Sequence, residues 1–267
     1  MAAAQSRPLF ESLLWLWEAG LRFASVINVG CAEGYFSVAL AEQGPARFSR
    51  ILNVDALEEY RESLEAVREA IGAQYAICAL DAEDGGTVEL HRGAHPYWSS
   101  LRPPGDKYWA TVNDLRSEAV QVPRRTLDSL VAEAGLPAPY LLILDVQGAE
   151  LQVLRGATAT LAACAAVSPE TALEDFPAVH EVMTRSGLRV ADLANLSYTA
   201  SGALGWFYPV YVGAQYAELR PVEYWDAAMN EETLQRQHAH RASAREQIRA
   251  SLARLKAGTW PPVEREV

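Results

Sequence analysis

The feature that most constrains the fold is a regular alternation of short apolar runs with amphipathic stretches. Residues 25–29, 50–55 and 140–145 are apolar runs of strand length, and a glycine or an aspartate stands at or just after the end of each one. Helical periodicity follows the first two runs, at about residues 33–43 and 56–71. Strands that alternate with helices build βαβ units around a parallel sheet. The sequence therefore predicts an α/β fold.

The remaining elements extend this pattern into one large domain. We expect further strands at residues 75–80, 165–173, 188–193 and 207–212, and further helices at residues 126–134, 149–163, 176–186 and 230–256. Residues 81–122 should form a loop with one or two short strands. We expect an N-terminal helix in residues 1–23 that packs on a core of residues 24–213, and a helical extension in residues 214–267.

Charge and composition narrow the choice of partners. The chain has 23 Lys and Arg against 34 Asp and Glu, and the net charge of −11 opposes binding to nucleic acid and to anionic membranes. Cys31, Cys78 and Cys164 are far apart and show no metal-ligand spacing, which indicates reduced thiols in a cytoplasmic protein. Glu11 interrupts the apolar stretch at residues 9–17, so we expect neither a signal peptide nor a membrane span.

A glycine turn follows the first predicted strand. Gly30 and Gly34 are four residues apart, which fits neither the dinucleotide pattern nor the phosphate-loop pattern and disfavours a nicotinamide-dependent oxidoreductase. A glycine at this edge of a parallel sheet lets a ligand approach the backbone, so we expect a nucleoside-type site. The alternative is a turn in which glycine serves the backbone geometry alone.

Asp55 ends the second predicted strand. An acidic residue in this position of a Rossmann-like sheet can accept hydrogen bonds from the ribose hydroxyls of a ligand. The alternative is a helix N-cap, since Glu58 stands three residues further on, as in a capping box. Both roles remain open at this point.

Residues 27–37 (INVGCAEGYFS), 125–130 (RTLDSL) and 143–157 (ILDVQGAELQVLRGA) form three distinctive blocks. In this order they resemble the signature blocks of the FkbM family of S-adenosylmethionine-dependent methyltransferases, and the similarity covers about residues 24–212. The resemblance implies a Rossmann-like class I methyltransferase fold with a seven-stranded, mostly parallel sheet flanked by helices. It also implies O-methylation of a hydroxyl group on a small molecule such as a sugar or a polyketide, with S-adenosyl-L-methionine as the cofactor.

The resemblance further implies which residues meet the cofactor. These are Asn28, Gly30, Ala32, Glu33, Gly34, Tyr35 and Phe36 around the first turn, Asp55 at the ribose, and Ala79, Leu80 and Asp81 beside the adenine. Three positions depart from the usual pattern of the family. Asn28 replaces Asp, Asp55-Ala56 replaces Glu-Pro, and Gln147 replaces a common Glu. The changes at Asn28 and Gln147 motivate an alternative in which the chain is a non-catalytic binding module.

Methyl transfer to an aliphatic hydroxyl needs a group that draws off the proton. Asp145, at the end of the most apolar strand, is our candidate base, and the alternative role is a cap on the following helix. His180 is the second candidate. Asp145, Glu150, Glu170 and Asp175 could supply ligands to a metal, but no fixed spacing demands one, and we expect none.

Aromatic residues gather in two segments, at 97–109 and 198–225. They suit a platform for a sugar ring or a polyketide, although Phe207, Tyr208 and Tyr211 could simply pack the last strands. The basic segment at residues 231–256 should form a helix that docks on its own domain. Its alternative is a contact in a homodimer.

Overall fold

The computed structural model describes residues 7–42, 50–103 and 117–219. Contacts divide the chain into two units, Met1–Arg220 and Pro221–Val267, and the described residues all belong to the first unit. The helix predicted at residues 230–256 and the proposed dimer contact lie outside the described residues. The aromatic residues Tyr108, Trp109, Tyr224 and Trp225 lie outside them as well.

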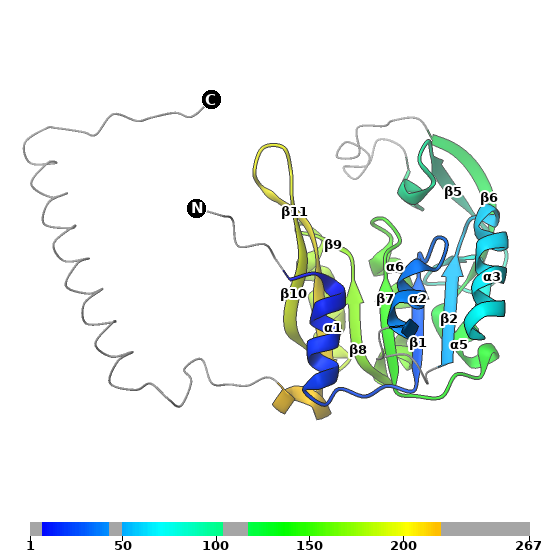
Figure 1. Ribbon diagram of the computed structural model, residues 1–267. Coiled ribbons are helices and arrows are strands. Elements are labelled where there is room, and N and C mark those ends of the chain that lie inside the picture. The colour runs from blue at the N-terminus through cyan, green and yellow to red at the C-terminus, as the bar shows by residue number, and fades with distance from the viewer. Residues whose placement is uncertain (1–6, 43–49, 104–116, 220–267) are drawn as a thin grey trace, which may run out of the picture. The chain divides into compact units, whose positions relative to one another are not determined.

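One twisted sheet forms the centre of the first unit (Figure 1). Its strands follow the order β10-β11-β8-β7-β1-β2-β3, and the short strand β9 pairs with β11. The bounds are β1 (Ser25–Val29), β2 (Arg50–Asp55), β3 (Gln74–Ile77), β7 (Tyr140–Leu144), β8 (Cys164–Pro169), β9 (Thr171–Ala172), β10 (Leu188–Tyr198) and β11 (Leu204–Gly213). Neighbouring strands pair in parallel except where β11 is involved. The prediction of a mostly parallel, Rossmann-like sheet flanked by helices is therefore confirmed.

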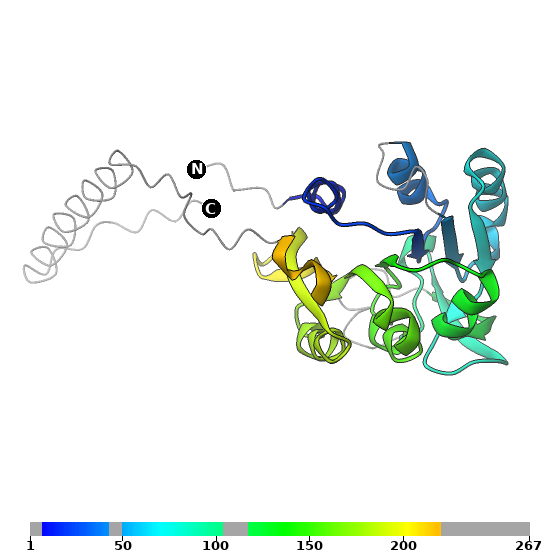
Figure 2. The same ribbon diagram turned by 90° about the horizontal axis from the view of Figure 1, so that it is seen from below.

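Helices cover both faces of the sheet (Figure 2). On one face lie α1 (Leu9–Glu18), α2 (Tyr35–Glu42) and α3 (Arg61–Ile71), and on the other lie α5 (Leu127–Ala134), α6 (Glu150–Arg155), α7 (Thr158–Ala162) and α8 (Phe176–Arg185). Successive residues of a strand point to opposite faces, so Leu141 packs under the first layer and Leu142 under the second. Every residue of β1 and β7 is buried, which explains why β7 is apolar throughout and why β1 is apolar except for Ser25 and Asn28.

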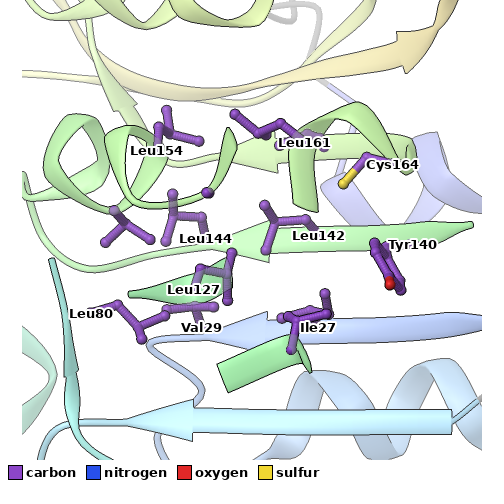
Figure 3. Packing of buried hydrophobic residues seen from close by; sticks show 14 of the residues in the cluster. Ile27, Val29, Leu80, Leu127, Tyr140, Leu142, Leu144, Leu154, Leu161 and Cys164 are labelled. Atoms are coloured by element: carbon purple, nitrogen blue, oxygen red, sulfur yellow. The ribbon is translucent and has the colours of Figure 1, made fainter. Parts of the chain in front are cut away.

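The second layer shows how the central strands are covered. Figure 3 shows Leu142 and Leu144 of β7 packed between Ile27 and Val29 of β1 and the helical residues Leu154 and Leu161. The single helix predicted at residues 149–163 is wrong, because the helix breaks after Arg155 into α6 and α7. At the break, a Cβ on Gly156 would lie 2.2 Å from the carbonyl oxygen of Asp81, so this position must remain a glycine.

The N-terminal helix α1 packs against β10. Asp192 accepts hydrogen bonds from Arg7 and Ser12, both at 2.8 Å, and Asn195 Oδ1 accepts one from the backbone of Leu9 at 3.0 Å. Leu9, Leu13 and Leu16 are buried together with the inner residues of the sheet. The helix therefore closes one face of the core.

A second, smaller sheet stands where we predicted mainly a loop. It consists of β4 (Ala79–Leu80), β5 (Thr87–Gly93) and β6 (Ser117–Arg125), in the order β4-β6-β5. The strand predicted at residues 75–80 is correspondingly split, because the chain leaves the central sheet at Cys78 and joins this one. Its apolar side chains, including Leu90 and Val122, pack against Leu57, Tyr60 and Leu64. A short 3-10 helix, η2 (Pro96–Trp98), follows β5.

Candidate active site

The strand register places the predicted site residues in one row across the sheet. Val29 pairs with Val54 on one side and with Leu144 on the other, and Leu144 pairs with Pro169. One position further along, Asp55, Gly30, Asp145 and Glu170 therefore lie on neighbouring strands. The strands β2, β7 and β8 all point toward this edge, which is at the top of Figure 1. Ligands of open α/β sheets bind at this carboxyl edge.

A cavity of about 1060 Å³ opens over this row. Its walls come from the turns after β1, β2, β7 and β8, from the small sheet with η2, and from the hairpin of β10 and β11. The predicted cofactor residues that line it are Gly30, Ala32, Glu33, Tyr35, Phe36, Asp55, Ala79 and Leu80, and the candidate base Asp145 lines it too. The structure thus brings most of the predicted site into one space.

Gly30 combines both roles that the sequence left open. It lines the cavity and has a φ of +69°, a conformation that strongly favours glycine. A Cβ at this position would lie 1.7 Å from the carbonyl oxygen of Asp145, because the turn after β7 crosses directly beside it. The glycine is therefore required to bring the turns after β1 and β7 together, as well as to leave room for a ligand.

Asp55 lines the cavity at the end of β2, where the cofactor is expected. Its carboxylate accepts hydrogen bonds from the backbone N–H of Ala32 at 2.9 Å and of Leu57 at 3.0 Å, so it ties the first turn to the second. The expected capping box is wrong, because Leu57 is the N-cap of the 3-10 helix η1 (Glu58–Tyr60) and Glu58 pairs with Arg61. Burial raises the pKa of Asp55 to about 6, against the backbone hydrogen bonds, which lower it.

Asp145 is the centre of a hydrogen-bond network at the other end of the cavity. Oδ1 accepts from Nε2 of Gln147 at 2.5 Å, and Oδ2 accepts from the hydroxyl of Tyr208 at 2.7 Å. The amide nitrogen of Gln147 also donates to Glu170 Oε2 at 2.9 Å. Burial and the nearby negative charge of Asp145 raise the pKa of Glu170 and the pKa of Tyr208 well above their usual ranges.

Glu150 is hydrogen-bonded to the turn that carries this network. Its Oε1 accepts hydrogen bonds from the backbone N–H groups of Val146 and Gly148, at 3.0 and 3.1 Å, and complete burial raises its pKa to about 7. Glu150 thus orders the turn that carries Asp145. Asp145 itself does not cap the next helix, because the N-cap of α6 is Ala149 and no side chain caps it. That alternative role for Asp145 is wrong.

Aromatic residues of η2 cover the cofactor side. The hydroxyl of Tyr97 donates to Glu33 Oε2 at 2.8 Å, and the Tyr97 ring stacks on Tyr60 with 6.3 Å between the ring centroids. Trp98 and Trp206 also line the cavity. Phe207 and Tyr211 are buried in the interior instead, as the packing alternative predicted for part of this aromatic group.

Four predicted residues stay outside the cavity that the described residues form. Asn28 is buried, and its amide donates to Ser37 Oγ, which in turn donates to Asn53. Gly34 packs against Leu64 and Val67 of α3, and the side chain of Asp81 points to Arg124. His180 lies on α8, where Nδ1 is 3.2 Å from the hydroxyl of the buried Tyr211 and the ring stacks on Phe176. The structure therefore does not bring His180 to the candidate site.

Sequence reasoning did not identify the roles of Gln147, Glu170 and Tyr208. Gln147 was noted only as a departure from the family, Glu170 as a possible metal ligand and Tyr208 as an aromatic residue. Their roles depend on the pairing of β7, β8 and β11, which joins segments that are distant in the sequence. Identifying them would have required knowing which strands become neighbours. In residues 7–42, 50–103 and 117–219, no group of three or more His, Cys, Asp or Glu side chains is arranged to hold a metal ion. No helix in these residues is long and apolar enough to cross a membrane.

Comparison with known proteins decides the family. The model of the methyltransferase FkbM domain matches residues 36–189, which is more than half of the chain. The chain belongs to the FkbM methyltransferase family. No curated protein sequence matches it significantly.

Several solved methyltransferase structures are similar to this FkbM-domain chain at low identity. Methyltransferase FkbM from Methylobacillus flagellatus is 13% identical with a TM-score of 0.46, over 71% of this chain and 43% of that one. A precorrin-6y C5,15-methyltransferase from Geobacter metallireducens is 8% identical with a TM-score of 0.38, over 74% and 84% of the two chains. A SAM-dependent methyltransferase from Aquifex aeolicus is 11% identical with a TM-score of 0.35, over 76% and 87%. The present chain thus spans less than half of the M. flagellatus protein.

The cofactor of this family is S-adenosylmethionine, and the residues of the cavity fit it. Asp55 would offer a half-buried carboxylate to the ribose hydroxyls, and the turn at Gly30 would let the ligand approach the backbone. Leu57, Ala79 and Leu80 offer an apolar wall for the adenine. The cavity of about 1060 Å³ continues from these residues to Asp145.

Proposed function

We propose that this chain is an O-methyltransferase that transfers the methyl group of S-adenosylmethionine to a hydroxyl group of a small molecule such as a sugar or a polyketide. One observation carries the proposal. Asp145, an acid at the carboxyl edge of the sheet, lines the same cavity as Asp55 and lies on the neighbouring strand to Gly30. The residues expected to bind the cofactor and an acid suited to a hydroxyl acceptor thus line the same cavity.

The chemistry explains why an acid is needed there. When bound, the cofactor supplies an electrophilic methyl group on a positively charged sulfur. An aliphatic hydroxyl is a weak nucleophile until its proton is drawn off. Asp145 is held by Gln147 and Tyr208, so its carboxylate has a fixed direction from which it can accept a hydrogen bond from the acceptor and orient the attacking oxygen.

The charge of the cavity lining narrows the range of chemical classes to which the acceptor can belong. Among the described residues, the lining includes Glu33, Asp55, Asp145, Glu150, Glu170, Glu174 and Asp175, and Arg102 is its one basic side chain. Arg102 is already engaged with Asp175 and with the carbonyl oxygen of Gly148. Such a lining repels a phosphorylated acceptor and favours a neutral or cationic one. We therefore infer a neutral sugar, an amino sugar or a polyketide as the acceptor.

Two alternatives are less well supported. A non-catalytic module was motivated by Asn28 and Gln147, but Asn28 is a buried residue that bonds to Ser37, and Gln147 bonds to two acids of the cavity. Neither change removes a group that the proposed chemistry requires. A nicotinamide-dependent oxidoreductase conflicts with the family match over residues 36–189.

The partners and the compartment follow from the sequence. We infer a small hydroxylated acceptor and neither nucleic acid nor membrane as partner, because the net charge is −11. Cytoplasmic location and a homodimer remain predictions of the sequence, and the residues expected at the dimer contact lie outside the described part.

The test uses methyl-labelled cofactor and a panel of acceptors. The panel contains neutral sugars, amino sugars, sugar phosphates and hydroxylated polyketides, and mass spectrometry locates the label. We expect a labelled oxygen on a neutral or amino-bearing acceptor and none on the sugar phosphates. Calorimetry with S-adenosylmethionine accompanies the panel. Tight cofactor binding without transfer to any hydroxyl would favour the binding module, and a label on nitrogen or carbon would rule out O-methylation.

A further inference from the structure

We propose that Glu170 is a second catalytic residue of this site, which takes the proton of the acceptor hydroxyl, and that Asp145 is its ionised partner. Gln147 and Tyr208 are the positioning residues of the pair. This inference deepens the proposed function and rests on it.

The strand register brings the two carboxylates together. Leu144 of β7 pairs with Pro169 of β8, so Asp145 and Glu170 are the next residues of two parallel neighbours and point to the same face. The backbone N–H of Glu170 donates to the carbonyl oxygen of Leu144 at 2.7 Å, which continues the pairing to this position. Both side chains line the cavity, so both can reach a bound acceptor.

The third strand adds Tyr208 to the same row. Phe207–Thr171 and Tyr211–Val167 belong to one antiparallel register, and in this register Tyr208 lies opposite Glu170. Its hydroxyl nevertheless donates past Glu170 to Asp145, at 2.7 Å. The register of β7, β8 and β11 therefore places Asp145, Glu170 and Tyr208 next to one another.

Gln147 joins the two carboxylates directly. Its amide nitrogen lies 2.5 Å from Asp145 Oδ1 and 2.9 Å from Glu170 Oε2. The residue has a φ of +55°, which is uncommon for a side chain larger than glycine. Ser100 fixes this conformation by donating to the carbonyl oxygen of Gln147 at 2.6 Å. A strained backbone at this point serves to direct one amide group at two acids.

The donors are distributed unequally. Asp145 accepts hydrogen bonds from both Gln147 and Tyr208. Of these two donors, Gln147 is the one that donates to Glu170. Ionised carboxylates are stabilised by donors, so the negative charge belongs on Asp145. Burial, then Asp145 and then Glu150 raise the pKa of Glu170, with Gln147 acting in the opposite direction. Arg102, the cationic side chain that the described part of the chain adds to the lining, pairs with Asp175. Glu170 is therefore the stronger base of the two once it is ionised.

The step balances in atoms and charge. The acceptor oxygen forms a bond to the methyl carbon as the bond between carbon and sulfur breaks, and sulfur keeps that electron pair. The proton of the hydroxyl passes to the ionised carboxylate of Glu170. One positive charge disappears at sulfur and one negative charge disappears at Glu170, so the net charge of the cavity stays constant. Glu170 then returns its proton to water.

The first test measures turnover in Glu170→Gln, with Glu181→Gln on the exposed surface of α8 as the matched control. We expect kcat to fall by about 10²–10⁴-fold in Glu170→Gln, which is the usual contribution of a positioned base. The dissociation constant of S-adenosylmethionine should change by no more than a few-fold, and the control should retain its activity. Glu170→Asp should keep part of the activity and the rise of kcat with pH, which Glu170→Gln should lose. Near-normal turnover of Glu170→Gln would overturn the proposal.

The second test needs no activity and separates this inference from the proposed function. NMR of carboxyl carbons in the ligand-free protein should show a glutamate that titrates well above the usual range, disappears in Glu170→Gln and moves to lower pH in Asp145→Asn. Absence of such a signal in a folded protein would overturn the proposal that Glu170 and Asp145 act as a pair. If the signal is present but the wild-type enzyme methylates no hydroxyl, the proposed function fails, and the catalytic role of Glu170 fails with it.

Discussion

The two ends of the cavity are built in different ways. At the proposed cofactor end, the glycine turn lies beside Asp55, whose carboxylate is held by the backbone N–H groups of Ala32 and Leu57 in adjoining turns. At the acceptor end, side chains from three strands meet around Asp145. Backbone geometry tolerates many sequences, whereas a side-chain network depends on each member. We therefore expect changes at the cofactor end to affect binding, and changes at the acceptor end to affect turnover.

Gly30→Ala should have the largest effect, because Gly30 joins the two ends. The added Cβ would lie 1.7 Å from a backbone oxygen of Asp145, on a residue with a φ of +69°. The chain must then move both turns or unfold, and we expect a loss of at least about 4 kcal/mol in the free energy of unfolding. Denaturant unfolding measures it. Gly72→Ala is a control that shares the positive φ but meets no atom within 4 Å. Similar losses in the two variants would disprove the role of the close approach.

Asp145→Asn should reduce kcat by about 10²–10⁴-fold, because the neutral amide cannot hold the hydroxyl as the carboxylate does and removes the negative charge that makes Glu170 a stronger base. The dissociation constant of S-adenosylmethionine should stay within a few-fold of the wild-type value. Single-turnover kinetics and calorimetry measure the two quantities on the same sample. If Asp145 were only structural, turnover would change little, and a loss of about 0.5–2 kcal/mol in stability would appear instead.

Glu150 should make stability depend on pH. Its pKa rises from 4.5 to about 7 on folding, so the folded protein holds this proton more tightly than the unfolded chain. The stabilisation is complete below about pH 4.5 and is lost as the pH rises through about 7, by about 3 kcal/mol. Glu150→Gln should remove this part of the slope in unfolding measurements between pH 4 and pH 8. Asp55→Asn should change the slope between about pH 3.8 and pH 6 and leave it unchanged above, because the pKa of Asp55 rises from 3.8 to about 6.

Asp55→Asn should weaken S-adenosylmethionine binding by about 10–100-fold, because a charged acceptor of hydrogen bonds is worth about 1.5–3 kcal/mol. At saturating cofactor, kcat should remain within a few-fold of the wild-type value. Calorimetry and initial rates test both statements. Glu58→Gln, an exposed neighbour that pairs with Arg61, is the control. A large loss of kcat with unchanged affinity would contradict the division of the cavity into a binding end and a reacting end.

The cofactor end was largely predictable from the sequence. Gly30 and Asp55 follow apolar strands within a short stretch of chain, so local pattern and spacing suffice to identify them. Asp145 was found for the same reason, because it ends the most apolar strand. The expected order of strands and helices also came from local periodicity, and it holds for the central sheet.

The acceptor end was not predictable in the same way. Glu170 and Tyr208 reach Asp145 only through the pairing of β8 with β7 and with β11, and no local pattern reveals which strands become neighbours. The break at Gly156 depends on the backbone of Asp81, and the small sheet depends on a parallel pairing of β4 with β6. His180 illustrates the opposite error, since a titratable side chain close to the site in sequence order points into the interior instead.

The departure of the chain from the central sheet at Cys78 has a consequence for how this protein could diversify. β3 ends one residue before Cys78 and β4 begins one residue after it, so the wall formed by Ala79 and Leu80 is tethered to the main sheet by a single residue. Residues 94–103, which follow β5 and carry η2 with its aromatic residues, belong to no strand of the main sheet. Replacements within η2 can reshape the mouth of the cavity, whereas Ser100 and Arg102 tie the residues after η2 to Gln147 and Gly148. Selection for new acceptors can therefore act first on η2, because the residues that follow it are constrained by these bonds to the reacting end.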